Sequence, residues 1–242
     1  MEVITVPQGS QEWLDLRRQY ITATEISTLF GLNPYKSAAQ MLRDKEGEPE
    51  FISNIHTRRG KILEPAVMEL CRIDYGMNVG RWAEEGKEDV LVDNRLGISC
   101  TPDGKLMLEE EIAPVECKTV LHSTYENKWL KKETFPSYYL LQLYVQMMLS
   151  DSNEGWLVGM SVSNELYHVV IKMCRSNAIE ELIDEAMAKL RNSKDENKTF
   201  RVSSKSKKSM QHELLNASEF MWCDYSKELQ ADTLDWEDIF WN

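Results

Sequence analysis

The chain has 242 residues, of which 42% are hydrophobic and 28% are charged, and its formal net charge is −12. This composition is typical of a soluble globular protein, and the length suits one domain with extensions. No stretch of about 18 apolar residues is present, which excludes a membrane-spanning helix. The N-terminus lacks the basic and apolar regions of a signal peptide, so we expect a cytoplasmic protein.

The cysteines and the charges narrow the class further. The five cysteines are widely separated and form no CxxC pair, which argues against a disulfide framework, a zinc site and an iron–sulfur cluster. Residues 209–242 hold eight acids and one lysine, whereas residues 189–208 hold eight basic and two acidic residues. The acidic balance argues against broad, nonspecific affinity for DNA, but it leaves room for a local groove that binds phosphate.

Residues 8–30 are predicted to form two helices, the first capped by Ser10 and the second by Thr24. Arg17, on the first helix, has two interpretations. It is either a solvated helix charge or a clamp for a phosphate group, which a guanidinium binds through two parallel hydrogen bonds. Thr24, at a helix N-terminus, would add a hydroxyl and free backbone donors to such a clamp. The sequence leaves both interpretations open.

Two further helices are predicted at residues 38–45 and at about residues 54–75, the second with apolar residues at helical spacing and Gly76 just beyond its end. Glu64 lies on the longer helix. It is either an exposed carboxylate paired with Lys61 or an acid that supports a metal site from a flanking helix. The helical pattern does not decide between these interpretations.

The remaining chain alternates strands and helices. Strands are predicted at residues 82–92, 97–105, 115–120, 156–161 and 166–173, and helices at residues 136–150 and 178–191. In the first of these helices Gln142 and Gln146 are four residues apart, so they share one face, while Tyr144 is expected in the core. The two amides are either buried against backbone groups or directed at a metal-bound water or a phosphate.

The motif that organises the chain lies between residues 97 and 120. Asp103 follows a proline, and after twelve residues Glu116, Cys117 and Lys118 stand in an apolar run. Because side chains alternate along a strand, Glu116 and Lys118 would face one side, near Asp103 if the two strands pair. Two carboxylates, a carbonyl and water suit Mg²⁺, and a lysine beside the metal can orient the attacking water. Taken alone, the spacing fits an ordinary hairpin with surface charges better.

The order of these motifs resembles the PD-(D/E)xK nuclease superfamily, and more narrowly the lambda-exonuclease or YqaJ-type viral recombinase family. The stretches that carry the resemblance are residues 12–17 (EWLDLR), 21–25 (ITATE), 60–64 (GKILE), 100–104 (CTPDG), 115–118 (VECK) and 139–142 (YLLQ). The resemblance implies an α/β fold, with a PD-(D/E)xK nuclease core in which helices flank a central mixed β-sheet, and with a C-terminal extension. It covers residues 9 to about 173 and overrides the hairpin interpretation.

The resemblance also implies roles for single residues. Asp103, Glu116 and the backbone carbonyl of Cys117 would bind Mg²⁺, for which Mn²⁺ could substitute. Lys118 would activate water, and Glu64 would assist the metal site.

A second group of residues follows from the same resemblance. Gln142 would sit against the metal site as a further catalytic residue. Arg17, Thr24 and Thr101 would hold the 5′-phosphate of the digested strand.

The implied reaction is Mg²⁺-dependent 5′-to-3′ digestion of one strand of linear double-stranded DNA, which leaves a 3′ overhang for phage-type single-strand-annealing recombination. The implied partners are DNA ends and an annealing or single-strand-binding protein, the implied assembly is a homo-oligomer such as a trimer, and the implied location is the cytoplasm of a bacterial host. Two alternatives stay open, namely an endonuclease of the same superfamily and a noncatalytic scaffold that binds DNA ends.

The sequence departs from the family pattern in three places. Tyr144 replaces the second glutamine of a Gln-x-Gln pair, and Thr57 and Arg58 stand where a hydrophobic wedge would split the duplex. The chain beyond about residue 192 has no counterpart. We therefore expect an exonuclease domain at residues 1–192, a basic serine-rich linker at 193–208 and an acidic aromatic tail at 209–242. The tail either docks on the protein partner or packs as a helix on its own domain.

Overall fold

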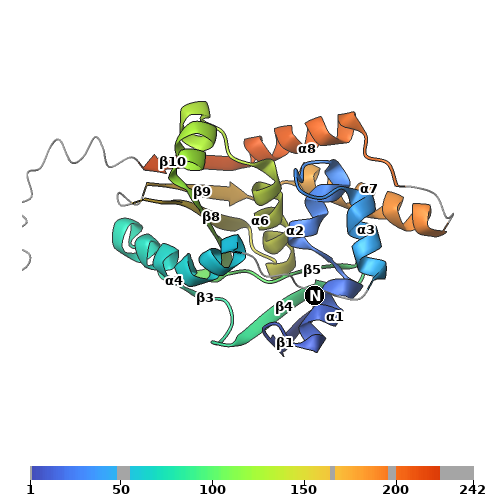
Figure 1. Ribbon diagram of the computed structural model, residues 1–242, viewed down its shortest axis with the longest axis horizontal. Helices are drawn as coiled ribbons and strands as arrows, with labels where there is room; N and C mark the ends of the chain where they lie inside the picture. Colours follow the sequence, from blue (N-terminus) through green and yellow to red (C-terminus); the bar gives the residue numbers. More distant parts are fainter. Residues whose placement is uncertain (1, 48–54, 164–166, 196–199, 224–242) are drawn as a thin grey trace, which may run out of the picture.

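A computed structural model describes residues 2–47, 55–163, 167–195 and 200–223. The described chain forms two β-sheets flanked by helices (Figure 1). The smaller sheet has the strand order β1 (Glu2–Pro7), β4 (Lys87–Asp93), β5 (Ile98–Cys100), β2 (Ile21–Thr22). Its β2 and β5 are parallel, whereas its other pairs are antiparallel.

The larger sheet runs β10 (Ser218–Cys223), β9 (His168–Cys174), β8 (Glu154–Val162), β7 (Ile112–Leu121), β6 (Gly104–Met107), β3 (Val79–Arg81). Strands β7 and β8 are parallel, and the other neighbours are antiparallel. A parallel pair needs a long crossover connection, which here contains a helix. The mixed α/β architecture expected from the sequence is confirmed, with two sheets instead of one central sheet.

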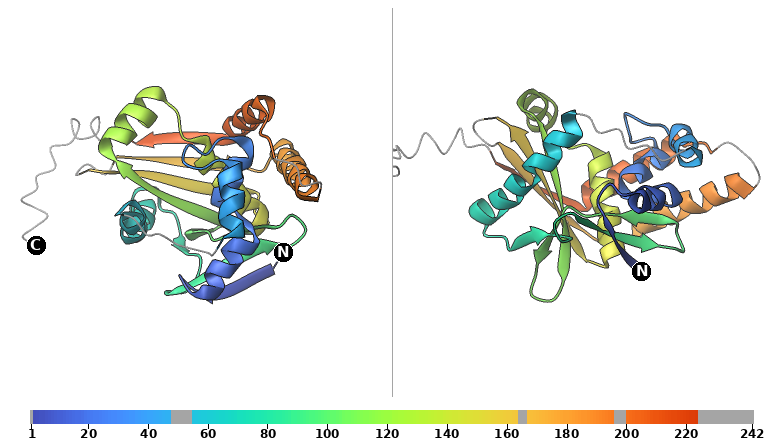
Figure 2. Two further views of the ribbon diagram at one scale, coloured as in Figure 1. Left: turned by 45° about the vertical axis from the view of Figure 1, so that its right-hand side comes forward. Right: turned by 60° about the horizontal axis from the view of Figure 1, so that its bottom comes forward.

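Helices cover both faces of the larger sheet (Figures 1 and 2). The longer helices are α1 (Gln11–Gln19), α3 (Ala38–Glu46), α4 (Ile55–Tyr75), α6 (Ser137–Ser150), α7 (Asn177–Asp195) and α8 (Ser204–Asn216). Helix α4 packs on one face through residues such as Val67 and Cys71, and α6 packs on the other face with α7 and α8. None of the helices in these described residues is long and apolar enough to traverse a lipid bilayer.

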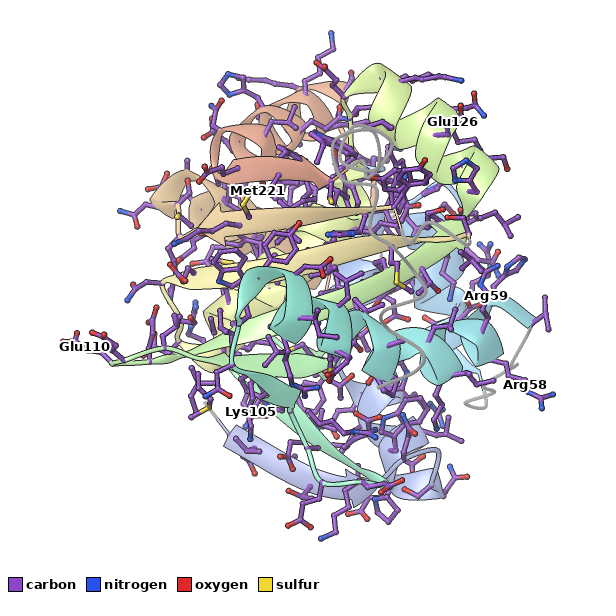
Figure 3. All side chains as sticks on the ribbon, turned by 90° about the vertical axis from the view of Figure 1, so that its left-hand side faces the viewer. Arg58, Arg59, Lys105, Glu110, Glu126 and Met221 are labelled. Carbon is purple, nitrogen blue, oxygen red and sulfur yellow. The ribbon has the colours of Figure 1, made fainter. Side chains whose placement is uncertain are left out.

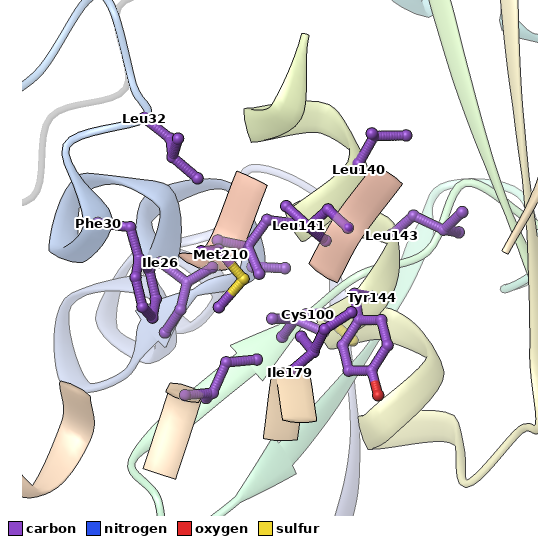
Figure 4. Packing of buried hydrophobic residues seen from close by; sticks show 14 of the residues in the cluster. Ile26, Phe30, Leu32, Cys100, Leu140, Leu141, Leu143, Tyr144, Ile179 and Met210 are labelled. Carbon is purple, nitrogen blue, oxygen red and sulfur yellow. The ribbon is translucent and has the colours of Figure 1, made fainter. Parts of the chain in front are cut away.

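Helix α6 lies at the centre of the main core. Its Leu140, Leu141 and Tyr144 are fully buried among side chains of the short helix α2 (Ala23–Ile26), the 3₁₀ turn at Ser27–Phe30, α7 and α8 (Figure 4). The sequence lacks the polar face of a surface helix here, as expected for a helix enclosed on all sides. The predictions for residues 38–45, 54–75, 136–150 and 178–191 are confirmed as helices.

Two predicted strands differ from the structure, one because it begins later and one because it is divided. Residues 82–92 contain only β4, after a turn that ends at Gly86 with φ of +78°. Residues 97–105 contain β5, which belongs to the smaller sheet, and the first residues of β6, which belongs to the larger one. Pro102, which has no backbone N–H, ends the first of these ladders. The chain therefore crosses from one sheet to the other within Thr101–Asp103.

The predicted helix caps have different outcomes. Ser10 caps α1, as expected, because its side chain accepts a hydrogen bond from the backbone N–H of Trp13 at 3.2 Å. The prediction for Thr24 is wrong, since Thr22 is the N-cap of α2 and forms a capping box with Glu25. The carboxylate of Glu25 accepts from both the backbone N–H and the hydroxyl of Thr22, at 3.0 and 2.9 Å. Thr24 instead lies in the first turn of this helix.

The chain after α7 is more ordered than the sequence suggests. Helix α8 begins at Ser204, inside the segment predicted as a linker, and its Met210 and Leu214 are fully buried. Strand β10 extends the larger sheet by pairing with β9. Residues 209–223 thus pack on their own domain, which is one of the two alternatives for the tail. Residues 224–242, which hold the rest of the predicted tail, lie outside the described residues, as do most of the loop predicted before α4 and part of the turn after Ser163.

Candidate active site

A group of charged side chains lies where the larger sheet meets the crossing at Thr101–Asp103. Asp103 accepts a hydrogen bond from the backbone N–H of Cys117 at 2.8 Å, which fixes this carboxylate against β7. Glu116 stands on β7 with 1% of its surface exposed, and the ammonium of Lys118, two residues on, is bonded to its Oε1. The structure therefore brings together Asp103, Glu116 and Lys118, as the alternation of side chains predicts.

Helix α6 supplies two amides to the same carboxylate. Gln142 Nε2 donates to Glu116 Oε1 at 2.6 Å, and Gln146 Nε2 donates to Glu116 Oε2 at 2.5 Å. The two glutamines are one helical turn apart, so both reach the strand beneath. For Gln146 the sequence left two interpretations open, an amide buried against backbone and an amide directed at the site, and the resemblance assigned a role to Gln142 alone. Its spacing from Gln142 was the only signal for it.

Tyr144 does not take part in this cluster. Its side chain is fully buried, its hydroxyl donates to the carbonyl of Ser176 at 2.7 Å, and it accepts from the backbone N–H of the same residue. The expectation that Tyr144 belongs to the core is confirmed. The second amide contact to Glu116 comes from Gln146, two residues further along the helix.

Two neighbouring carboxylates help to raise the pKa of Asp103. Burial raises the pKa of Asp103 well above its usual value, and the charges of Glu116 and Glu64 raise it further, whereas Lys118 opposes the rise. Burial by itself lowers the pKa of Lys118, but the charges of Glu116 and Asp103 outweigh it and raise this pKa. The cluster of Asp103, Glu116 and Glu64 thus holds more negative charge than Lys118 alone balances.

Glu64, on α4, is half-buried beside this cluster. Burial raises its pKa, the charge of Arg81 opposes the rise, and the charges of Glu88 and Glu116 add to it. Glu88, on β4, also has a raised pKa because of burial, although the amide of Gln8 donates to it. No pattern in the sequence distinguishes Glu88 from the other acidic residues, of which the chain has 40 in total.

The donor set fits a hard divalent cation. Mg²⁺ prefers oxygen ligands and commonly takes one or two carboxylates, water and a substrate phosphate. Asp103 and Glu116, with the carbonyl of Cys117, would offer that set. Burial raises the pKa of Asp103 most, and a cation would relieve the repulsion from Glu116 that adds to this rise. Within the described ranges, no group of three or more His, Cys, Asp or Glu side chains is arranged as a complete metal cage. The fit is therefore to a cation that keeps part of its water shell.

A small cavity of about 20 Å³ lies beside the carboxylates. Its lining includes Arg17, Thr24 and Thr101, the three residues predicted to hold a phosphate. The other lining residues are Trp13, Thr22, Ala23, Val90, Ser99, Cys100, Gln142 and Gln146. The structure thus places the three predicted residues around one cavity, with the glutamines of α6 as its shared wall with the carboxylate cluster.

Arg17 is held in place from several sides. Its guanidinium carbon lies 4.7 Å from the centre of the Trp13 ring, a cation–π contact. The ammonium of Lys45 donates to the backbone carbonyl of Arg17 and forms an ion pair with Glu25 at 2.5 Å. Burial lowers the pKa of Arg17, while the charges of Glu25 and Glu88 oppose this change. A guanidinium stays charged under such a shift, so Arg17 presents a positive charge to the cavity.

The start of α4 carries the residues found where a wedge was expected. Arg58 is exposed and projects away from the ribbon (Figure 3). Arg59 is partly buried, and its Nη2 donates to the carbonyl of Thr119, at the end of β7, at 3.4 Å. Its Nε is buried without a hydrogen-bond partner among the described residues. The sequence did not single out Arg59, because an arginine run on a helix gives no sign of which member faces the sheet.

A mixed sheet that carries two acids and a lysine on adjoining strands, with a flanking helix that adds an acid, is the core of the PD-(D/E)xK nucleases. A family model described as the YqaJ-like viral recombinase domain matches residues 12–153. The match covers more than half of the chain, which therefore belongs to this family, a family of nucleases. No curated protein matches the chain.

Solved structures agree with the fold. An alkaline exonuclease from Laribacter hongkongensis is 16% identical with a TM-score of 0.58, and the likeness covers 92% of this chain and 98% of that chain. The same enzyme in complex with dAMP gives the same identity, TM-score and share of this chain, and the likeness covers 100% of that chain. A phage-related exonuclease from Haemophilus somnus 129PT is 13% identical with a TM-score of 0.46, covering 84% of this chain and 99% of that chain.

Proposed function

We propose that the chain is a Mg²⁺-dependent exonuclease that digests one strand of linear double-stranded DNA from its 5′ end. The observation that carries this proposal is the adjacency of the acidic cluster and the cavity of Arg17, Thr24 and Thr101. Membership of a viral recombinase family supports it, as does the fold shared with an alkaline exonuclease. One similar structure binds dAMP, the kind of product that an exonuclease releases one nucleotide at a time.

In this proposal the cluster performs hydrolysis. Asp103, Glu116 and the carbonyl of Cys117 hold the cation, which when bound would lower the pKa of a water and stabilise charge on the phosphate oxygens. The ammonium of Lys118, bonded to Glu116, orients the attacking water and balances charge in the transition state. Glu64 adds a negative charge from α4 that strengthens attraction for the cation.

The cavity selects the end of the strand. The guanidinium of Arg17 pairs with a terminal phosphate, and the hydroxyls of Thr24 and Thr101 donate to its oxygens. A strand held by its 5′-phosphate in this cavity presents its next phosphodiester to the neighbouring carboxylates. Cleavage there releases a mononucleotide and leaves a new 5′-phosphate, so the reaction proceeds 5′ to 3′.

The remaining parts of the proposal concern context. We propose that the 3′ overhang serves single-strand-annealing recombination with an annealing or single-strand-binding protein, in the cytoplasm of a bacterial host. We also propose a homo-oligomer such as a trimer. We propose that residues 1–192 hold the exonuclease site, and that α8 and β10, which lie within the predicted linker at 193–208 and tail at 209–242, complete its fold. The family's name supports the recombination role.

The testing experiment uses linear duplex DNA with a 5′-phosphate on one strand only, incubated with Mg²⁺, Mn²⁺ or EDTA. We expect the phosphorylated strand to disappear with either metal and to survive in EDTA, and we expect Lys118→Ala to lose roughly 100-fold or more in rate. Lys189→Ala is the matched control, because this exposed lysine also pairs with a glutamate, Glu185, but lies on α7 away from the cluster.

Three outcomes separate this function from its alternatives. Cutting of covalently closed circles would indicate an endonuclease instead. Binding of DNA ends without loss of either strand would indicate a noncatalytic scaffold. Full activity in EDTA, or in Lys118→Ala, would contradict the assigned chemistry.

A further inference from the structure

Two glutamines separate the acidic cluster from the cavity. Gln142 and Gln146 each donate to one oxygen of Glu116, at 2.6 and 2.5 Å, and both also line the cavity that contains Arg17. Glu116 does not line this cavity. The two amides are therefore the groups in contact with both halves of the site.

The chemistry of the partners fixes the direction of each amide. A carboxylate only accepts hydrogen bonds, so the NH₂ group of each glutamine must face Glu116. The carbonyl oxygen of each glutamine is the other branch of the planar amide and is directed away from the bond to Glu116. Both oxygens, Gln142 Oε1 and Gln146 Oε1, are buried without a hydrogen-bond partner among the described residues. Gln142 is 7% exposed and Gln146 is fully buried, so bulk water does not reach them freely.

The hydrogen-bond donors that these two oxygens lack must come from the cavity. A buried acceptor without a donor is unfavourable, and such groups are normally paired with protein or ordered water. A phosphate oxygen is itself an acceptor, so a terminal phosphate cannot satisfy an amide oxygen directly. A water molecule has two hydrogens, so it can donate one to an amide oxygen and the other to the phosphate, and the cavity's volume of about 20 Å³ is enough for one water.

We propose that Gln146, together with Gln142, links the occupant of the cavity to the position of Glu116. A 5′-phosphate on Arg17 orders a water that donates one hydrogen to the phosphate and the other to the amide oxygen of Gln146, and the NH₂ groups of Gln146 and Gln142 in turn fix the carboxylate of Glu116. Gln146 is thus a positioning residue, since it contacts Glu116 and the ordered water but not the reacting atoms. This inference rests on the proposed exonuclease function and names how that site reads the end of a strand.

The consequence is a preference measured in the rate of hydrolysis. Coupling between two sites commonly changes a binding or reaction step about 5- to 150-fold. We expect the wild type to digest an end with a 5′-phosphate faster than the same end with a 5′-hydroxyl. Removal of the Gln146 amide should reduce this rate ratio by about fivefold or more. An effect through stability alone would lower both rates in parallel and leave their ratio unchanged.

The experiment compares initial rates on two linear duplexes that differ only in a 5′-phosphate or a 5′-hydroxyl at one accessible end. The proteins are the full chain as wild type, Gln146→Leu, Gln146→Asn, Arg17→Ala and the double variant Gln146→Leu/Arg17→Ala. Gln146→Leu keeps the approximate size of the side chain and removes its amide, whereas Gln146→Asn keeps a buried amide but withdraws it from Glu116 by one methylene. The matched control is Gln40→Leu, since Gln40 is an exposed amide on α3 bonded to its helix neighbours Arg43 and Asp44. Thermal unfolding of each variant accompanies the rates.

The expected result is a reduced ratio in both Gln146 variants, an unchanged ratio in the control, and a double variant whose ratio is no lower than that of Arg17→Ala alone. A Gln146 variant that is slower on both ends with the wild-type ratio would overturn the coupling and leave the exonuclease function intact. A wild type that digests neither duplex would overturn the proposed function, and the inference with it. A wild type that digests both ends equally fast would overturn the inference and the end selection proposed for the cavity, and would leave the metal-dependent hydrolysis intact.

Discussion

The two halves of the site are built on different sheets and differ in how their polar groups are satisfied. The larger sheet holds Glu116, whose two oxygens accept from Lys118, Gln142 and Gln146. The smaller sheet and the helices beside it hold Arg17 and its threonines, which surround a cavity. One half is thus a packed network, and the other is a space with polar walls.

The difference matches what each half has to do. Chemistry requires donors and acceptors that are already in place before the transition state forms, because reorganising them would cost free energy. Recognition of a strand end requires room that the ligand fills and contacts that the ligand completes. The carboxylates are therefore held rigidly by their hydrogen bonds, whereas the position proposed for the phosphate is an open cavity.

The largest expected effect comes from removing charge in the packed half. Asp103→Asn keeps an acceptor for the N–H of Cys117 but removes a carboxylate whose pKa is raised by burial and by Glu116. We expect hydrolysis to fall roughly 100-fold or more, because the cation loses a ligand, while stability at neutral pH is unchanged or higher, because repulsion is relieved. Single-turnover rates and urea unfolding measure the two quantities. A large loss of stability would mean that the acids of this half are structural.

The open half should respond by losing selectivity. Arg17→Ala removes the guanidinium from the cavity. We expect discrimination between 5′-phosphate and 5′-hydroxyl ends to fall about tenfold to a hundredfold, as for the loss of hydrogen bonds to charged groups. Competition between the two kinds of end measures it. Arg18→Ala is the control, because Arg18 is exposed and donates to the carbonyls of Lys45 and Glu46. Equal loss in both variants would argue against a specific clamp at Arg17.

A methyl group added at Gly159 tests the packing behind the acidic cluster. A Cβ at Gly159, which pairs with Lys118 across β7 and β8, would lie 2.9 Å from the Trp129 ring and 3.0 Å from the Phe135 ring. We expect Gly159→Ala to destabilise the fold by about 1–3 kcal/mol, as overpacking does. Gly80→Ala is the control, since nothing lies within 4 Å of a Cβ there. Denaturant midpoints that agree for the two variants would show that the side chains around Gly159 accommodate an added methyl group.

The smallest effect concerns the helix that carries Thr24. Thr22→Ala removes the capping box of α2, which also orients Glu25 toward Lys45. Loss of an N-cap costs about 1 kcal/mol, so we expect a modest fall in melting temperature. We expect a smaller loss of end selectivity than in Arg17→Ala, because the guanidinium of Arg17 remains in the cavity. A fall in selectivity as large as that of Arg17→Ala would show that the open half depends on this cap.

The sequence predicted the parts of the site that local patterns encode. Alternation along a strand placed Glu116 and Lys118 on one side, and the helical period placed Gln142 and Gln146 on one face. Long periodic elements such as α4 and α6 were predicted nearly to their ends. These features depend on the repeat of one element, which a single sequence displays directly.

The features that the sequence did not reveal depend on contacts between elements. The run at residues 97–105 is β-prone throughout, and only the strands on either side decide that its two ends join different sheets. The lysine-rich start of α8 suggests a linker, but burial of Met210 and Leu214 makes it a helix. The packing of α6 on β7 brings Gln146 to Glu116. The sequence could not show this, because a buried structural amide and an amide of the site have the same spacing along a helix.

The pairing of the strands also sets an order of folding for the two halves. Glu2 pairs with Val92 and Ile21 with Ile98, so the smaller sheet closes long loops, which slows its formation. In contrast, β7, α6 and β8 follow one another along the chain and can assemble from consecutive residues. During synthesis these two effects oppose each other, because residue 98 emerges before β8. The smaller sheet can therefore begin to close early, whereas the unit with Glu116, Lys118 and both glutamines is complete only after β8 has emerged.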